Sequence, residues 1–299
     1  GASRGGRRAR LPRCRWLAGG SFRRPTTQNA QLARLLEVSG TPKPGNVDRH
    51  REYDGLRFEH FVAGAVCARD GLRLAAGGAE VGESFRRAVA GMSQQSGGNT
   101  QFGALLILTP LVRASTAHEL TPAGVRDIVT ETTVEDAEKF YKAFEYVDVA
   151  VDDPPEGMEP LDVRRGSDAV PTLEARELTL FDVMTDSEDV DGVAAEWTGE
   201  FRRVFDAAGE ILADDGPVPD RASRAFVDML AEERDTFVVT RNGPEAAAEV
   251  RRRAQAVRDG EEDARELAEE LVRRDINPGT TADLVVGALF VALERGLVV

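Results

Sequence analysis

Helical spacing of apolar residues runs through nearly the whole chain, and this spacing constrains the fold more than any other feature. Apolar side chains recur every three to four positions, which is the period of an amphipathic helix. Strand-like alternation is confined to residues 236–240. We therefore expect an all-α fold, a single-domain helical bundle over residues 26–299, although a length of 299 residues would also allow two domains. The first expected helix is capped by Thr26 or Thr27 and runs to about residue 39. The other expected helices cover about residues 56–69, 82–95, 101–114, 123–131, 133–147, 179–186, 190–213, 220–232, 244–258, 262–273 and 281–295.

The first residues differ from the rest in composition. Residues 1–26 hold eight arginines and no acidic residue, and helical spacing begins directly after Pro25. Three interpretations are open, namely a nucleic-acid or targeting arm, a signal peptide, and a non-native extension. No apolar stretch follows the arginines, which argues against a signal peptide. The abrupt change in composition favours an extension, so we expect residues 1–25 to be a basic, disordered and functionally silent segment.

Charge limits the partners of the remaining chain. The whole sequence carries 38 Lys+Arg against 52 Asp+Glu, so the part after residue 26 has a net charge of −22 and only three lysines. An acidic, lysine-poor composition suits a cytoplasm at multimolar salt, and it opposes binding to a nucleic acid. The longest apolar runs cover about ten residues, too few to span a membrane. We therefore expect a cytoplasmic protein with neither membrane nor nucleic acid as partner, and oligomeric state leaves no trace in the sequence.

The first segment with candidate functional residues is 37–54. Glu37 ends the first predicted helix, and the loop after it places Lys43 between two prolines. Glycines in this loop let backbone N–H groups approach an anion, and a lysine supplies a compact cation suited to phosphate. The charged stretch that follows contains Asp48, Arg49 and Asp54. The alternative interpretation is an ordinary connector with solvated charges.

Two further glycine-bearing turns each lead into an apolar helix. The turn at residues 96–103 contains Asn99, Thr100 and Gly103, and a helix N-terminus of this kind can bind an anion. Its alternative is a plain helix cap by Asn99 or Thr100. The turn at residues 274–283 contains Asn277, Gly279 and Asp283. There Thr280 with Asp283 fits a capping box, while Asp283 also suits Mg²⁺ beside a bound triphosphate. Two such turns predict a bundle with one polar, loop-lined end.

Taken together, these segments resemble the triphosphoribosyl-dephospho-CoA synthase family. Residues 37–54 are similar to the family's opening Glu, Thr-Pro-Lys-Pro-Gly and Val-Asp-Arg pattern. Residues 98–104 resemble its Gly-x-Asn-Thr-His-Lys-Gly-Ala motif, and residues 277–284 resemble its Pro-Gly-Gly-Ser-Ala-Asp-Leu ending. Residues 235–243 give a weaker match to an Asp-Thr…Ser-Arg-x-Gly stretch. Where the family has His-Lys, this chain has Gln101 and Phe102, and its departures are those of an archaeal-type branch.

The resemblance implies a fold, a reaction and a set of roles. The triphosphoribosyl group of ATP would move to the 2′-hydroxyl of dephospho-CoA with release of adenine, and Mg²⁺ would accompany ATP. The carboxylates Glu37, Asp48 and Asp54 would act as acid, base or charge-stabilising groups, and Asp48 and Asp283 would hold Mg²⁺. Groups implied to bind the nucleotide are Lys43, Arg49, Asn99, Thr100, Gly103, Asn277 and Gly279.

Two other functions remain open at this point. One is transfer of a related ribosyl or nucleoside group to a different hydroxyl acceptor at the same site. The other is a helical nucleotide-binding protein that kept the loops and lost catalysis together with the His-Lys pair. Release of free adenine from ATP, and its dependence on the acceptor, distinguishes the three.

Overall fold

Helices form where apolar residues keep helical spacing, and this pattern extends along the chain. The computed structural model describes residues 24–117, 119–154 and 156–299, and within them it contains sixteen α-helices and no strand. The predicted all-α fold is therefore confirmed. The helices are α1 (Thr26–Ser39), α2 (Phe58–Cys67), α3 (Arg69–Ala76), α4 (Val81–Met92), α5 (Phe102–Ala117), α6 (Pro122–Thr130), α7 (Val134–Ala143), α8 (Val170–Arg176), α9 (Leu180–Ser187), α10 (Gly192–Thr198), α11 (Arg202–Ala213), α12 (Val218–Glu232), α13 (Thr236–Asn242), α14 (Pro244–Arg258), α15 (Ala264–Arg273) and α16 (Gly279–Glu294), with 3₁₀ helices at Glu159–Leu161 and Val163–Ala169.

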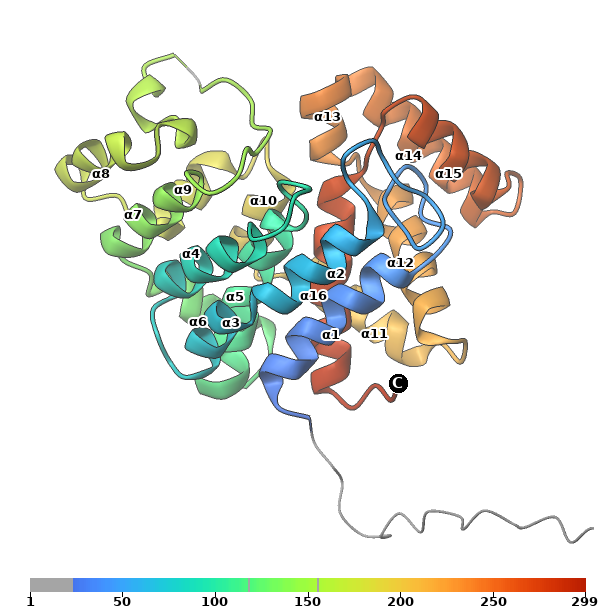
Figure 1. The fold of residues 1–299 in the computed structure, drawn as a ribbon, viewed down its shortest axis with the longest axis horizontal. Helices are drawn as coiled ribbons and strands as arrows, with labels where there is room; N and C mark the ends of the chain where they lie inside the picture. Colours follow the sequence, from blue (N-terminus) through green and yellow to red (C-terminus); the bar gives the residue numbers. More distant parts are fainter. Residues whose placement is uncertain (1–23, 118, 155) are drawn as a thin grey trace, which may run out of the picture.

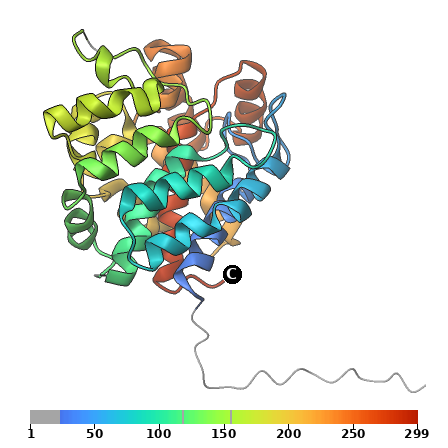
Figure 2. The same cartoon turned by 60° about the vertical axis from the view of Figure 1, so that its left-hand side comes forward.

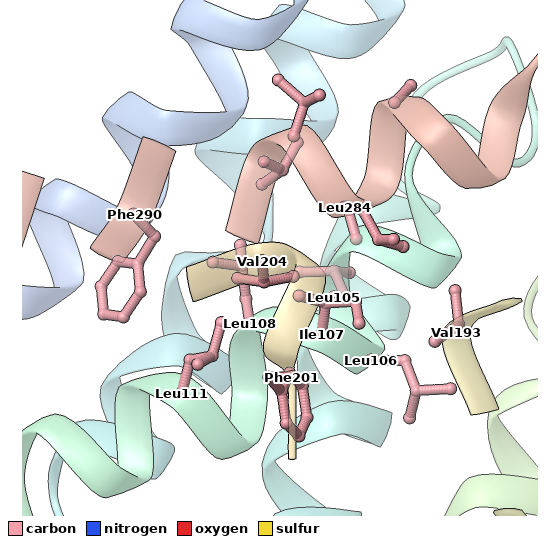
Figure 3. Close-up of a cluster of buried hydrophobic side chains, with 14 of the residues drawn as sticks. Leu105, Leu106, Ile107, Leu108, Leu111, Val193, Phe201, Val204, Leu284 and Phe290 are labelled. Atoms are coloured by element: carbon pink, nitrogen blue, oxygen red, sulfur yellow. The ribbon is translucent and has the colours of Figure 1, made fainter. Parts of the chain in front are cut away.

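The last helix, α16, is the centre of the bundle. It is apolar on nearly all sides, as expected of a helix buried all round. It packs against α1, α5, α11 and α12, and Figure 1 shows it running through the middle of the molecule. Figure 3 shows Leu284 and Phe290 of α16 near Leu105 and Leu108 of α5. One core cluster extends from Ala30 to Leu297, so the helices form a single bundle.

Two groups of helices flank this centre. On one flank α4 packs against α3 and α7, and an aromatic cluster joins Phe85, Phe102, Phe140 and Phe144. On the other flank α12, α13 and α14 pack together, and α15 follows α14 (Figure 1, Figure 2). The loop of residues 40–57 and the turn of residues 93–101 lie at the same end of the bundle as the start of α16. The functional side chains described below come from that end.

Three predictions about individual elements need correction. The strand-like residues 236–240 form α13, because Asp235 accepts a hydrogen bond from Val238 N–H and starts a helix there. The predicted helix over 190–213 is two helices, broken where Glu200 and Phe201 take positive φ values. Thr26 and Thr27 do not cap α1, whose first residue is Thr26 itself.

The predicted disordered extension over residues 1–25 lies, up to residue 23, outside the described residues. Within residues 24–117, 119–154 and 156–299, none of the helices combines the length and the apolar character needed to cross a membrane.

Candidate functional site

The buried pair Lys43 and Glu37 anchors the loop of residues 40–57 to the end of α1. Lys43 has no exposed surface, and its Nζ donates to Glu37 Oε1 and, at 2.7 Å, to Asn46 Oδ1. Asn46 Nδ2 in turn donates to Asn277 Oδ1 at 2.8 Å. The first and third motifs of the sequence, more than two hundred residues apart, are therefore joined by side-chain hydrogen bonds.

Close backbone packing completes this junction. Gly45 has a φ of +74°, and a Cβ at this position would lie 2.2 Å from the carbonyl oxygen of Ile276. A residue with a side chain would push the loop away from the segment before α16. Tyr53 hydroxyl donates to the carbonyl oxygen of Gly45 and contacts that of Ile276 at 3.2 Å. The prolines and glycines that look like a plain connector in the sequence thus form a packed loop.

Burial and the charge of Lys43 shift the pKa of Glu37 in opposite directions. Burial raises the pKa of the Glu37 carboxyl, and the nearby Asp48 carboxylate raises it further. The Lys43 ammonium and a hydrogen bond from the Gln101 side chain lower that pKa. Burial has the largest effect, so the pKa of Glu37 lies above its ordinary value.

Asp48 is buried and faces backbone and side-chain donors. Its carboxylate accepts hydrogen bonds from His50 N–H at 2.8 Å, from Arg51 Nη1 at 3.2 Å and from Lys43 N–H at 3.4 Å. Arg51 also reaches Thr41 Oγ1 and Glu269, so it ties the loop to α15. These contacts make Asp48 the central acceptor of the loop.

Asp283 brings a third carboxylate from α16 to the start of α5. Its carboxylate lies against Gly103 and keeps some solvent exposure. A Cβ on Gly103 would lie 2.1 Å from Asp283 Oδ2, so glycine is needed for this approach. Burial, followed by the carboxylate of Glu37, raises the pKa of Asp283 well above its ordinary value. Asp283 therefore does not form the predicted capping box with Thr280, whose Oγ1 instead accepts from Phe237 N–H.

Two aspartates that were not among the predicted site residues belong to the same neighbourhood, although Asp235 begins the weakest of the motif matches. Asp235 is buried, starts α13, and accepts hydrogen bonds from Thr281 N–H at 2.7 Å and Thr281 Oγ1 at 2.8 Å. Asp191 starts α10 and accepts from Val193 N–H and Ala194 N–H. Both carboxylates contribute to the raised pKa of Asp283. In the sequence, each of these aspartates is a capping residue directly before a short helix. The apolar residues on either side made these short helices hard to recognise.

Residues of the turn before α5 differ in what their side chains contact. Asn99 Oδ1 accepts from Phe102 N–H at 3.0 Å, which is the cap that its position allows. Thr100 Oγ1 is buried with no hydrogen-bond partner among the described residues. Phe102 packs in the aromatic cluster with its ring centroid 4.8 Å from that of Phe144. The position held by lysine in the resembled motif thus carries a core side chain here.

The remaining predicted residues lie farther from this junction. Arg49 and Asp54 are exposed, and no hydrogen bond or ion pair within the described residues connects them to Glu37, Lys43 or Asp283. Asp54 lines an open surface groove with His60 and Ser96. Gly279 lies against the Phe237 ring, where a Cβ would be 3.1 Å from that ring. Their roles in nucleotide binding or catalysis stay predictions.

This end of the bundle contains a small cavity. A cavity of about 170 Å³ is lined by Gly192, Asp235, Thr236, Thr280 and Arg203, among others, at the starts of α10, α13 and α16. In the part of the chain that the structure describes, no three His, Cys, Asp or Glu side chains are arranged to hold a metal ion by themselves.

Comparisons with known proteins agree with this architecture. A family model described as ATP:dephospho-CoA triphosphoribosyl transferase matches residues 23–298. A crystal structure of a protein from Archaeoglobus fulgidus, described as a candidate triphosphoribosyl-dephospho-CoA synthase, matches with a TM-score of 0.65. The two sequences are 23% identical, the match covers 79% of this chain and 99% of that chain, and likeness at this identity shows the fold. The search of curated proteins gave no match. Because the family model spans nearly all of the sequence, the chain belongs to the ATP:dephospho-CoA triphosphoribosyl transferase family.

Proposed function

We propose that this chain carries out its family's reaction at the junction of Glu37, Lys43 and Asp283. The bond between ribose C1′ of ATP and adenine N9 breaks, and a bond forms between C1′ and the 2′-oxygen of dephospho-CoA. The proton of that hydroxyl passes to a base, adenine leaves with a proton from an acid, and the triphosphate stays on the transferred ribose. The family match over residues 23–298 is the observation that carries this proposal.

The carboxylates suit the chemistry of such a transfer. Breaking a glycosidic bond develops positive charge at C1′, and it needs an acid for the leaving group and a base for the attacking hydroxyl. Burial raises the pKa values of Glu37 and Asp283, so these carboxyl groups can carry a proton nearer to neutral pH than ordinary ones. We assign proton transfer to Glu37, and we assign to Asp48 the fixing of the loop.

Mg²⁺ fits this site as an ion shared with the triphosphate. The Asp283 carboxylate is desolvated beside those of Glu37, Asp235 and Asp191, and among the described residues no lysine or arginine forms an ion pair with it. Carboxylate oxygens are preferred Mg²⁺ ligands, and Mg²⁺ in nucleotide sites commonly uses one or two carboxylates together with phosphates. Asp283 would hold the ion, with Asp48 the second residue implied by the family resemblance. When bound, the ion would neutralise triphosphate charge.

Nucleotide phosphates would meet the polar loops around this junction. Lys43 is the buried cation of the first loop, and its removal would take away the ion pair that holds this loop to Glu37 of α1. The turn of residues 99–103 contains the Thr100 hydroxyl, which is buried and has no protein partner among the described residues. The acidic, lysine-poor composition supports a cytoplasm at high salt as the setting.

A direct assay tests this proposal. The purified chain is incubated with ATP, Mg²⁺ and dephospho-CoA in multimolar KCl, and adenine and the acceptor are followed by chromatography and mass spectrometry. We expect adenine release that depends on both Mg²⁺ and dephospho-CoA, with one triphosphoribosyl group added per adenine released. Nucleotide binding without adenine release would overturn the catalytic proposal. Adenine release that ignores dephospho-CoA and requires another hydroxyl compound would overturn the acceptor.

A further inference from the structure

The cavity at the starts of α10, α13 and α16 has no part in the reaction as described so far. Its volume is about 170 Å³, and its wall includes Gly192 and Ala195 of α10, Thr236 of α13, and Thr280 and Leu284 of α16. An engineered cavity of about 150 Å³ in another protein binds one benzene molecule, and pockets for drug-sized ligands have volumes of about 300 Å³ or more. The cavity therefore has room for one planar ring system and not for a whole nucleotide.

Two threonine hydroxyls on the cavity wall leave one hydrogen without an acceptor. Thr236 Oγ1 accepts from Gly192 N–H at 3.0 Å, and Thr280 Oγ1 accepts from Phe237 N–H at 3.2 Å. The two oxygens lie 3.0 Å apart, so one hydroxyl donates to the other. A hydroxyl has one hydrogen and two lone pairs, so the one that accepts twice has only its hydrogen left to offer. Among the described residues this hydrogen has no acceptor, so a ligand with an acceptor nitrogen or oxygen can take it.

The charge of the cavity wall opposes a phosphate group. Four carboxylates and two guanidinium groups line the cavity, so the wall is net negative. The guanidinium of Arg203 is already paired with Glu233, and that of Arg234 is exposed. The carboxylates of Glu188 and Asp189 form no ion pair within the described residues. A triphosphate would be repelled here, whereas the N–H groups of a neutral heterocycle would find acceptors.

The cavity adjoins the Asp283 carboxylate, which we assign to Mg²⁺ and the triphosphate. Leu284 of the cavity wall follows Asp283 directly along α16, and Val193 follows Gly192 of the wall along α10. A Cβ on Gly103 would lie 3.3 Å from Val193 Cγ2 and 2.1 Å from Asp283 Oδ2, so these two side chains meet at Gly103. A nucleotide with its base in the cavity would therefore extend its ribose and phosphates towards Asp283.

We propose that this cavity binds the adenine ring of a substrate nucleotide, with the free threonine hydrogen donated to a ring nitrogen and a wall carboxylate accepting from the 6-amino group. The inference rests on the proposed function, because that function names ATP and dephospho-CoA, which both carry an adenine. ATP is the expected source, since the cavity adjoins Asp283. The base and the triphosphate of one nucleotide then contact separate groups of residues, and each group can be tested alone.

A variant that fills the cavity tests the inference by equilibrium binding. Ala195 is half-buried on the wall, and Ala195→Leu adds bulk there. We expect its affinity for ATP with Mg²⁺ to fall by about 10-fold or more, because the ring loses its contacts, and its affinity for inorganic tripolyphosphate to change by less than about twofold. A fall for dephospho-CoA alone would identify that nucleotide as the source of the ring. Unchanged affinity for both nucleotides, or an equal fall for both and for tripolyphosphate, would overturn the inference. The matched control is Ala256→Leu, a half-buried position on α14 outside the cavity wall, which should leave all three affinities unchanged.

Conservative variants keep the test valid if Ala195→Leu fails to fold. Thr236→Val and Thr280→Val each remove one hydroxyl and keep the shape of the side chain. Only one of the two hydroxyls donates to the ring, so we expect one variant to weaken ATP binding by roughly 2- to 10-fold and the other by less than about twofold. The double variant should match the weaker single variant, and unchanged ATP affinity in the double variant would contradict the inference. Thr130→Val, at an exposed position on α6, is the control.

Binding and turnover together separate failure of this inference from failure of the proposed function. If the parent chain releases no adenine from ATP, while Ala195→Leu loses ATP affinity and keeps tripolyphosphate affinity, the adenine site stands and the catalytic proposal is wrong. If the parent chain does release adenine and Ala195→Leu has the same KM for both nucleotides, only the adenine site is wrong. In the parent chain, free adenine should compete with ATP and bind together with tripolyphosphate. Competition between adenine and tripolyphosphate would overturn the inference.

Discussion

The carboxylate of Asp283 occupies the space that a side chain on Gly103 would need. A Cβ at residue 103 would lie 2.1 Å from Asp283 Oδ2 and 2.9 Å from its Cγ. The two residues lie on different helices, and their approach brings the Asp283 carboxylate to the first turn of α5. This contact brings the end of the sequence to its second motif.

Gly103→Ala should therefore displace Asp283 or the start of α5. We expect a fall in kcat of about 100-fold or more, because a reacting group shifts by about 1 Å, and a loss of stability of about 1–3 kcal/mol from overpacking. Adenine release and chemical unfolding measure the two effects. The matched control is Gly209→Ala on α11, where a Cβ meets nothing within 4 Å and alanine should stabilise the helix by about 0.5–1 kcal/mol. Unchanged kcat in Gly103→Ala would contradict the role of this contact.

Lys43→Ala should destabilise the chain and weaken ATP binding together. It leaves Glu37 buried without its cation, which costs about 3–5 kcal/mol in comparable buried pairs, and it removes the hydrogen bond from Lys43 to Asn46 within the loop. Thermal unfolding and equilibrium ATP binding measure the outcome. The control is Lys139→Ala, whose partly exposed lysine pairs with Glu135 along one helix and should cost about 0.3–0.5 kcal/mol. A folded Lys43→Ala variant with unchanged ATP affinity would exclude a role in nucleotide binding.

Phe102→Lys should unfold the chain rather than create activity. The ring of Phe102 is 5.0 Å from that of Phe85 and 4.8 Å from that of Phe144, measured between centroids, and the side chain is buried. Loss of a buried phenylalanine costs about 3–5 kcal/mol, and a buried ammonium adds to that cost. Phe102→Leu is the control and should fold with a much smaller loss. Measurement of the melting temperatures decides the case, and a stable, more active Phe102→Lys variant would show that this position faces the substrate.

Asp283→Asn should change how stability depends on pH. The pKa of Asp283 in the folded chain lies above its ordinary value of 3.8, so its favourable contribution is complete below that value. That contribution is lost as the pH rises through the folded pKa. Because asparagine cannot ionise, we expect the variant to be more stable than the parent chain at pH 8, with a difference that shrinks below about pH 4, and to lack turnover.

Urea unfolding at several pH values measures this difference. The control, Glu270→Gln, should behave with the opposite sign, because hydrogen bonding to Arg253 lowers the pKa of Glu270 to about 2. The contribution of Glu270 is present above its ordinary value of 4.5 and is lost as the pH falls towards 2. An Asp283→Asn variant that is less stable than the parent chain at pH 8 would show that the charged carboxylate is stabilised in the fold.

Local patterns predicted many helices closely. Residues 26–39 and 244–258 form α1 and α14 close to the expected bounds, because the helical spacing of apolar residues is set within a few residues. Residues 236–240 were predicted wrongly, since β-branched residues can form a helix when Asp235 caps it and α14 and α16 cover it. The break at Glu200 and Phe201 was also missed, because no proline marks it.

The candidate site could be predicted only in part. The resemblance indicated Glu37, Lys43, Asn277 and Asp283, and the structure brings these residues to one end of the bundle. Asn46 was not found, because a polar residue in a loop is typical of a solvated surface. The structure does not join Arg49 and Asp54 to that junction.

The sequence by itself determined the helical class, the positions of the loops and the chemical types gathered in them. These depend on hydrogen bonds and side-chain spacing between near neighbours, and such interactions are readable along one stretch of chain. The tertiary structure decided which polar groups face one another, such as Asn46 with Asn277 and Gly103 with Asp283. Burial and long-range contact set the pKa values of Glu37 and Asp283, and both arise only when distant helices pack.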